Sequence, residues 1–360
     1  MNRRKFLQTT GAITFCATAA PPFSLTAAEN HTLSSRHLPR WRGFNLTEKC
    51  VKQREGNVPF QERDFALLAE WGFEFARLPL SYHFWSDPDD PLTLRGEDLK
   101  DIDDAVEFGR KHGVHVNLNL HRAPGYCVNP PREPLDLWTD EKAVEACAFH
   151  WAHLAKRYKG IRNERLSFDL LNEPANVSEA AYVRVVKHLI GAIRGEDPQR
   201  LIIADGLQWG RDPVIGLVGL GIAQSTRGYD PMQLTHYKAN WVKGSNEWPE
   251  PSWPLRSGEK DLTTKETLRQ QRIQPWKQLE RKGVGIHVGE WGVFNQTPHK
   301  AALSWMRDCL DLWKEAGWGW ALWNLHGSFG VLDSNRADVE YEDFRGRKLD
   351  VEMLRLLQSF

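Results

Sequence analysis

Two glutamates each follow an apolar run and precede turn-forming residues. Glu173 lies in the segment from Phe168 to Pro174, and Glu290 lies in the segment from Ile286 to Gly292. The first residue beyond the C-terminal end of a strand in a (β/α)₈ barrel projects toward the active-site face, so an acid there meets substrate. Cleavage of a glycosidic bond uses a pair of carboxyl groups. The two glutamates therefore predict sugar hydrolysis.

The elements that must position these acids alternate in type along the chain. Eight short apolar runs are separated by longer segments in which apolar residues recur at three- and four-residue spacing. This alternation predicts an α/β protein with a parallel sheet, and eight units fit a single (β/α)₈ TIM barrel with long βα loops. The predicted strands are 41–46, 73–80, 114–120, 166–171, 201–204, 232–236, 284–288 and 318–324, and the predicted helices include 60–71, 99–112, 142–159, 178–195, 268–282 and 299–316.

Composition narrows the range of partners. The 360 residues carry 47 basic and 47 acidic side chains, so no global field favours nucleic acid, and an uncharged partner is expected. Sixteen tryptophans supply flat apolar faces that suit core packing and stacking on sugar rings. The sequence has no glycine-rich phosphate cradle and no paired metal-binding histidines, so no cofactor and no metal are expected.

The first 28 residues form a separate segment. Paired arginines at Arg3 and Arg4 precede a mild apolar stretch, 10–20, and a small-residue exit at Ala28. This pattern predicts a twin-arginine export signal, 1–28, and a catalytic domain, 29–360, that is periplasmic or extracellular. A cytosolic N-terminus that merely begins with two arginines is the alternative. The apolar stretch is too short for a membrane span. Separately, the protein is expected to be a monomer.

Five cysteines show no CxxC pair, and Cys16 falls within the predicted signal. The four others, Cys50, Cys127, Cys147 and Cys309, could form disulfides in an oxidising compartment. Buried free thiols are the default expectation.

The residues at the predicted strand ends form an ordered set. They are Arg77 after the second strand, His121 after the third, Asn172 and Glu173 after the fourth, His236 and Tyr237 after the sixth, Glu290 after the seventh and Trp323 at the eighth. This order resembles glycoside hydrolase family 5, the cellulase and mannanase family of retaining (β/α)₈ enzymes. The resemblance runs from about Trp41 to the C-terminus.

The resemblance implies a role for each of the acids. Glu173 would be the acid/base and Glu290 the nucleophile, with their carboxyl groups about 5 to 5.5 Å apart in a retaining enzyme. Like-charge repulsion from Glu290 would raise the pKa of Glu173 and keep it protonated. Arg77 would hold Glu290 ionised through a charge-assisted hydrogen bond, and Tyr237 could add a second one.

The remaining strand-end residues would contact the sugar or tune the acids. Asn172 would bind the sugar 2-hydroxyl, His236 would tune Glu173, and His121 would lie in the active site. Trp323 would form a floor for the sugar ring, and loop residues Trp209, Trp241, Trp248 and Trp253 are candidate subsite platforms.

Each acid also has a structural interpretation, since Glu173 could cap a helix and Glu290 could pair with a lysine. The motif departs from the family at one point: the family separates its histidine and tyrosine by one residue, whereas His236 and Tyr237 are adjacent. Adjacent residues of a strand point to opposite sides.

The expected activity is hydrolysis of β-linked oligo- or polysaccharide, with endo-acting cleavage of β-1,4-glucan favoured. A β-mannanase, another β-glycanase or an exo-β-glucosidase of the same family is the alternative. A catalytically silent glycan-binding barrel is the alternative from another class.

Overall fold

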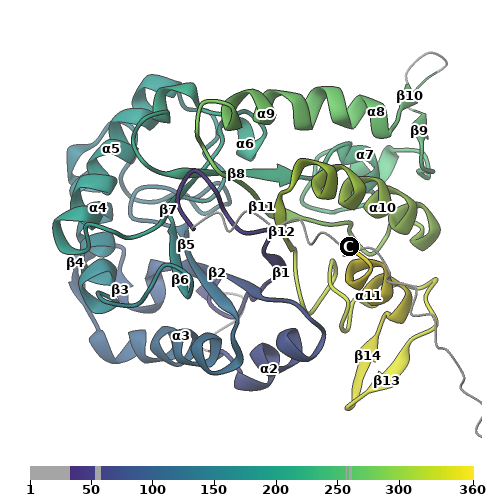
Figure 1. The fold of residues 1–360 in the computed structure, drawn as a ribbon, viewed down its shortest axis with the longest axis horizontal. Coiled ribbons are helices and arrows are strands. Elements are labelled where there is room, and N and C mark those ends of the chain that lie inside the picture. Colours follow the sequence, from purple (N-terminus) through teal and green to yellow (C-terminus); the bar gives the residue numbers. More distant parts are fainter. Residues whose placement is uncertain (1–32, 53–57, 257, 259–261) are drawn as a thin grey trace, which may run out of the picture. The chain divides into compact units, whose positions relative to one another are not determined.

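A computed structural model describes residues 33–52, 58–256, 258 and 262–360 (Figure 1). The predicted export signal and Cys16 lie outside the described residues. Among the residues described, no helix is long and apolar enough to cross a bilayer. Cys147 and Cys309 are buried free thiols, and Cys127 is a free thiol at intermediate depth.

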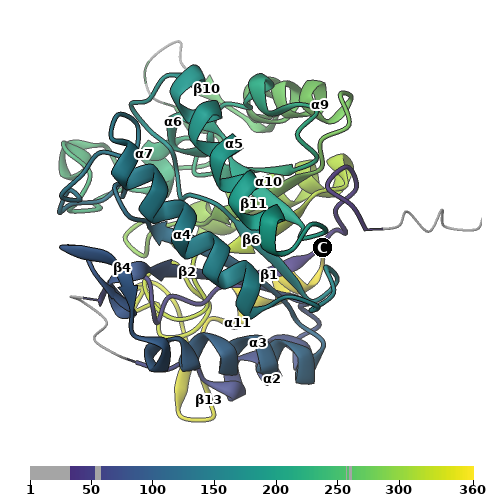
Figure 2. The same cartoon turned by 90° about the vertical axis from the view of Figure 1, so that its left-hand side faces the viewer.

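Eight parallel strands close into a barrel in the order β1-β12-β11-β8-β7-β6-β5-β2. Helices surround the strands in both views, and α4 and α5 lie side by side on the outside (Figure 1, Figure 2). The predicted (β/α)₈ barrel is therefore confirmed. The barrel strands are β1 Arg42–Asn45, β2 Phe75–Ser81, β5 His115–Arg122, β6 Leu166–Asp169, β7 Ile202–Asp205, β8 Ala223–Gly228, β11 Ile286–Trp291 and β12 Gly319–Leu322.

The outer helices begin and end where the sequence provides caps. The side chain of Asp140 accepts a hydrogen bond from the first turn of α4, and that of Ser178 does the same for α5. Gly113 and Gly317 end α3 and α10 in the left-handed conformation. The helices are α2 Glu62–Glu70, α3 Lys100–His112, α4 Glu141–Arg157, α5 Glu179–Glu196, α6 Leu207–Gly210, α7 Met232–Thr235, α8 Lys265–Leu268, α9 Gln274–Glu280, α10 His299–Ala316 and α11 Val351–Gln358.

Shorter elements lie in the loops. The predicted helix 268–282 is interrupted by a π-helical segment, Arg269–Ile273, between α8 and α9. The described residues of the long segment 238–262 include one turn of 3₁₀ helix, Ser245–Glu247, and parts of the paired short strands β9 and β10. The short strands are β3 Ser86–Asp87, β4 Asp90–Leu94, β9 Leu255–Arg256, β10 Leu262–Thr263, β13 Glu342–Phe344 and β14 Arg347–Leu349.

The predicted sixth strand, 232–236, is wrong. Residues Met232–Thr235 form helix α7, and the sixth strand of the barrel is β8, Ala223–Gly228. The apolar-run criterion missed β8 because its buried residues are mostly polar. The Gln224 side chain, for example, is fully buried and bonds both backbone groups of Val214. Asp230-Pro231 then turns the chain into α7.

The end of the barrel opposite the strand C-termini is closed by aromatic rings and neutral histidines. The ring of His115 stacks on Phe75 at 5.4 Å, and that of His287 lies 4.5 Å from the same phenyl ring. His115 Nε2 lies 2.7 Å from Ser167 Oγ. Burial lowers the pKa of both histidines to about 3. Both rings are therefore neutral in the folded protein at ordinary pH.

These histidines predict a loss of stability in acid. An unfolded histidine has a pKa of about 6.5 and binds a proton as the pH falls, whereas the buried rings stay neutral down to about pH 3. Stability is therefore full above the unfolded pKa and declines below it, by about 2 kcal/mol per histidine at pH 5. We expect His115→Gln, whose amide can still reach Ser167, to reduce the slope of unfolding free energy against pH in urea titrations.

His188→Gln is the matched control, because the His188 side chain is 42% exposed on the protein surface. An unchanged slope in His115→Gln, or an equal change in both variants, would contradict this account.

Candidate active site

Arg77 is buried at the centre of the C-terminal end of the barrel. Its Nη1 donates to Glu290 Oε1 at 2.5 Å, and its Nε donates to Asp169 Oδ2 at 2.8 Å. Nη1 also donates to Asn45 and Nη2 to Asn172, each at 3.0 Å. The predicted contact between Arg77 and Glu290 is therefore present, and the arginine also joins strands β1, β2, β6 and β11.

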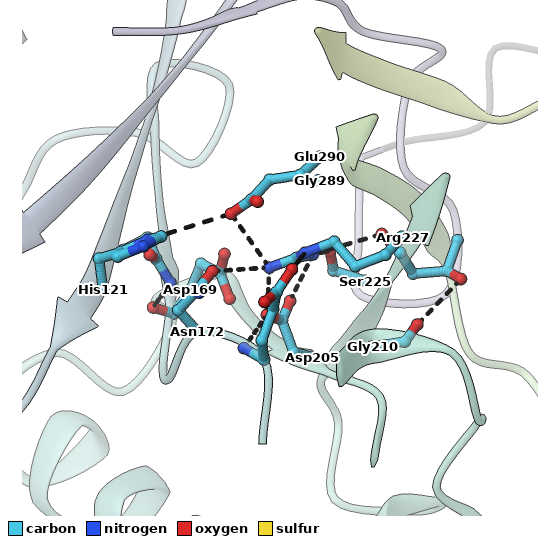
Figure 3. Close-up of polar contacts among 12 residues, drawn as sticks. His121, Asp169, Asn172, Asp205, Gly210, Ser225, Arg227, Gly289 and Glu290 are labelled. Carbon is cyan, nitrogen blue, oxygen red and sulfur yellow. Dashed lines mark hydrogen bonds and ion pairs between the residues drawn. The ribbon is translucent and has the colours of Figure 1, made fainter. Parts of the chain in front are cut away.

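Glu290 lies near the end of β11, where the register of the strand shifts between Val288 and Glu290. This irregularity lets Glu290 point into the barrel mouth, where only 5% of its side chain is exposed. Besides Arg77, its carboxylate lies 3.5 Å from Arg227 Nη2, 4.0 Å from His121 Nδ1 and 3.4 Å from the hydroxyl of Tyr229. Figure 3 shows His121 and Arg227 reaching Glu290 from two directions.

Glu173 is held through its backbone. It adopts φ = 51°, a left-handed conformation that is uncommon for a residue with a side chain. Its N–H donates to Asp205 Oδ2 at 2.8 Å, and its carbonyl accepts from the Tyr126 hydroxyl at 2.8 Å. The Tyr126 hydroxyl in turn accepts from Ala175 N–H at 2.9 Å. These bonds fix the turn and direct the Glu173 side chain, which is 16% exposed, toward Arg227.

The surroundings keep Glu173 protonated. Burial and, after it, the negative charge of Glu290 raise the pKa of Glu173 to about 8, against the opposing effect of Arg227. Burial and Asp205 likewise raise the pKa of Asp169 to about 7. The site therefore holds one carboxyl group that can donate a proton near neutral pH beside another, Glu290, that lies against two guanidinium groups.

Asn172 is oriented by both arginines. Its Oδ1 accepts from Arg77 Nη2 at 3.0 Å and from Arg227 Nη2 at 2.9 Å. Because both arginines are donors, they fix which end of the amide is the oxygen. The Nδ2 at the other end is buried without a hydrogen-bond partner among the described residues. A buried donor of this kind suits a hydroxyl group of a bound ligand.

His121 and Trp323 stack on each other across the barrel mouth. Their ring centroids are 5.5 Å apart with an interplanar angle of 17°. The backbone N–H of Trp323 donates to the backbone carbonyl of Trp291 at 2.7 Å, which ties Trp323 to the end of β11. The structure thus places His121 4.0 Å from Glu290 and stacks Trp323 on His121.

The strand-end placement of His236 and Tyr237 is wrong, because these residues follow helix α7. His236 contacts the rings of Tyr229, Trp241 and Phe329 and the hydroxyl of Thr235. Tyr237 is buried, and its ring lies 5.0 Å from Lys238 Nζ. The hydroxyl that reaches Glu290 belongs to Tyr229 instead.

Sequence reasoning missed Arg227, Tyr229 and Asp205. Arg227 and Tyr229 stand at the end of β8 with one residue between them, which is the spacing that the family resemblance expected at this strand, with arginine in the place of histidine. Asp205 ends β7 just as Asp169 ends β6. A search for strand-end acids would have found both aspartates.

The candidate loop tryptophans differ in exposure. Trp241 is 57% exposed and Trp209 is 40% exposed, so both offer a ring face to a ligand. Trp248 is half-buried. Trp253 packs against the core, and its indole N–H donates to Asp308 at 2.9 Å. Within the described part of the chain no cluster of three or more His, Cys, Asp or Glu residues could hold a metal ion.

A barrel whose strand ends bring two glutamates to one shared guanidinium group, that of Arg227, has the paired carboxyl groups that glycoside hydrolases use. Comparison with known proteins supports the assignment to this class of enzyme. The family model described as cellulase, glycosyl hydrolase family 5, matches residues 32–328. The chain belongs to this family.

Individual relatives share this architecture. Endoglucanase C of Acetivibrio thermocellus is 26% identical over 306 residues, which cover 78% of this chain and 88% of the relative. A crystal structure described only as a glycoside hydrolase is 38% identical, with a TM-score of 0.85 over 89% of this chain and 99% of the other. Endoglucanase Cel5A of Thermotoga maritima has a TM-score of 0.72 at 22% identity, over 88% and 96% of the two chains, and shares the fold.

The backbone support of Glu173 predicts the effect of removing one hydroxyl. Tyr126→Phe deletes the donor to the Glu173 carbonyl and the acceptor of Ala175 N–H. We expect kcat/KM on a soluble glycan to fall roughly tenfold, because about 1 to 2 kcal/mol of positioning is lost.

Tyr158→Phe is the control, since it removes a similarly buried hydroxyl that donates to Asp103 on the outer helices. Equal losses of activity in both variants at equal folding stability would show that Tyr126 does not act through Glu173.

Proposed function

We propose that this protein is a retaining, endo-acting glycoside hydrolase of β-1,4-glucan in which Glu173 is the acid/base and Glu290 the nucleophile. The observation that carries the proposal is the opposite treatment of the two carboxyl groups. Burial raises the pKa of Glu173 to about 8, whereas Glu290 receives a hydrogen bond from Arg77 and lies 3.5 Å from Arg227.

In the first step a carboxylate oxygen of Glu290 forms a bond to the anomeric carbon. The bond from that carbon to the leaving sugar oxygen breaks, and the proton of Glu173 passes to this oxygen. The negative charge of Glu290 disappears into the glycosyl ester, and Glu173 becomes the carboxylate.

In the second step water attacks the anomeric carbon and gives a proton to Glu173, and Glu290 leaves as a carboxylate. The unpaired amide donor of Asn172 would bind the sugar 2-hydroxyl, a contact that strengthens in the oxocarbenium-like transition state. Trp323, stacked on His121, would form the floor beneath the sugar ring.

The substrate assignment rests on relatives and on the aromatic loops. Relatives that match most of this chain are named as an endoglucanase and, at 25% identity, a cellodextrinase. Exposed Trp209 and Trp241 fit a neutral glycan that stacks on aromatic faces. A β-mannanase, another β-glycanase or an exo-β-glucosidase on the same scaffold is the alternative, because specificity lies in the loops.

We also propose that the segment 1–28 exports the enzyme, on the basis of its paired arginines and its small-residue exit. The mature enzyme, 29–360, would act as a monomer in the periplasm or outside the cell. Processing at Ala28 in a cell fraction, read by N-terminal sequencing, tests this assignment.

The direct test is hydrolysis of soluble β-1,4-glucan, β-mannan and xylan by residues 29–360, with Glu173→Ala and Glu290→Ala alongside. We expect endo cleavage of the glucan and a loss of at least about 10⁴-fold in Glu290→Ala, because no nucleophile remains. Cleavage of mannan alone would overturn the substrate assignment. Binding of glycan without cleavage by the wild type would favour the silent barrel.

The acid/base role predicts a leaving-group-dependent pH profile. The wild type should lose kcat/KM above about pH 8 as Glu173 loses its proton. Glu173→Ala should retain glycosylation by an activated aryl glycoside, which needs no protonation of its leaving group, and should lack this basic limb. A basic limb that persists in Glu173→Ala would assign the acid to another residue.

A further inference from the structure

Arg227 is a buried charged residue that contacts both catalytic glutamates. It lies near the end of β8, and 3% of it is exposed. Its Nε donates to Glu173 Oε1 at 3.3 Å, and its Nη2 lies 3.5 Å from Glu290 Oε1. Figure 3 shows the guanidinium between Glu290 on one side and Asp205 on the other.

Asp205 fixes the orientation of Arg227. It is fully buried, and its two carboxylate oxygens accept from Nη1 and Nη2 of the guanidinium. Its Oδ2 also accepts from the Glu173 backbone N–H. Nη1 donates in addition to Ser225 Oγ at 3.0 Å. A planar group held at these points cannot rotate away from either glutamate.

The surrounding backbone leaves space for this arginine at two glycines. A Cβ at Gly210 would lie 2.6 Å from Arg227 Cγ, and a Cβ at Gly289 would lie 2.8 Å from its Nη1. Gly210 also adopts φ = 73° and accepts from Thr226 Oγ1. The chain on both sides of β8 is thus shaped around the Arg227 side chain.

The proposed reaction moves one negative charge from Glu290 to Glu173. Before glycosylation the charge lies on Glu290, and in the glycosyl-enzyme it lies on Glu173. The Arg77 guanidinium donates to Asp169, Asn45, Asn172 and Glu290, and among the described residues it has no hydrogen bond to Glu173. Arg227 contacts both, and its guanidinium stays protonated throughout the working pH range.

Resting on the function proposed above, we propose that Arg227 is a positioning residue shared by the two catalytic carboxyl groups. Its fixed positive charge, oriented by Asp205, faces the negative charge of the site before and after that charge moves from Glu290 to Glu173. Arg227 thereby acts in both chemical steps, whereas Arg77 acts chiefly on the ionised nucleophile.

The pH profile separates this role from a structural one. The groups that face Glu173 are Glu290, Asp205, Arg77, Tyr126, Tyr229 and Arg227 itself. The positive charge of Arg227 lowers the pKa of Glu173, against burial and the two neighbouring acids. Removing this charge therefore raises the pKa of Glu173, and the basic limb moves to higher pH.

The experiment measures kcat/KM against pH for residues 29–360 with Arg227→Met and Arg227→Lys. In Arg227→Met we expect a loss of about 10²-fold or more at pH 6 and a basic limb that is higher by about one pH unit. In Arg227→Lys we expect the limb near its wild-type position but incomplete recovery of rate, because an ammonium cannot bridge Asp205 and both glutamates in one plane.

The second measurement is the rate of glycosyl-enzyme hydrolysis, taken from burst kinetics with an activated aryl β-cellobioside. In the glycosyl-enzyme Glu173 carries the negative charge. Arg227→Lys should slow its hydrolysis, because the lysine ammonium cannot bridge Asp205 and both glutamates in one plane. This readout keeps the proposal testable if Arg227→Met does not fold. An unchanged basic limb in a folded Arg227→Met, or an unchanged deglycosylation rate in Arg227→Lys, would overturn the proposal.

Arg200→Lys is the matched control. Arg200 is also 3% exposed and paired with an aspartate, but its other bonds go to the carbonyls of Leu166 and Tyr158 and to the Asn163 side chain. Arg200→Lys should change the free energy of unfolding and leave the basic limb of kcat/KM against pH at its wild-type position. A wild type that cleaves no glycan would instead refute the proposed function, which distinguishes the two failures.

Discussion

Two buried guanidinium groups determine how the mouth of this barrel is built. Arg77 and Arg227 lie among four carboxyl groups, those of Asp169, Glu173, Asp205 and Glu290. An unpaired charge at this depth would be strongly unfavourable, so each group requires the others. The strained turn at Glu173, the irregular register of β11 and the glycines beside Arg227 all serve to bring these charges into contact.

The two ends of the barrel differ in the charge state of their buried polar groups. At one end, His115 and His287 are kept neutral and packed among aromatic rings. At the other, charges are retained and paired because the reaction uses them. Stability in acid and catalysis therefore depend on separate titrating groups within one core.

Much of this arrangement could be predicted from sequence, for a physical reason. Seven of the eight barrel strands have apolar residues that face surrounding helices, and these give a readable pattern. β8 lacks that pattern because its inner residues are polar: Gln224 and Thr226 bond buried backbone carbonyls, Ser225 accepts from Arg227, and Arg227 pairs with Asp205. The apolar run of α7 mimics a strand instead, so the pattern points to His236 and Tyr237 where the structure has Arg227 and Tyr229.

The charged network also divides unequally along the chain. The part up to β7 contributes Arg77 together with Asp169, Glu173 and Asp205, while the part from β8 onward contributes Arg227 and Glu290. Within the first part, one cation faces three acids, and Asp205 meets its cation only when β8 docks beside β7. The part up to β7 therefore cannot neutralise its own interior in isolation, whereas Arg227 and Glu290 in the part from β8 onward face each other at 3.5 Å. An engineered fragment that ends after β7 would thus have an intrinsic electrostatic reason to bind the strand that carries Arg227.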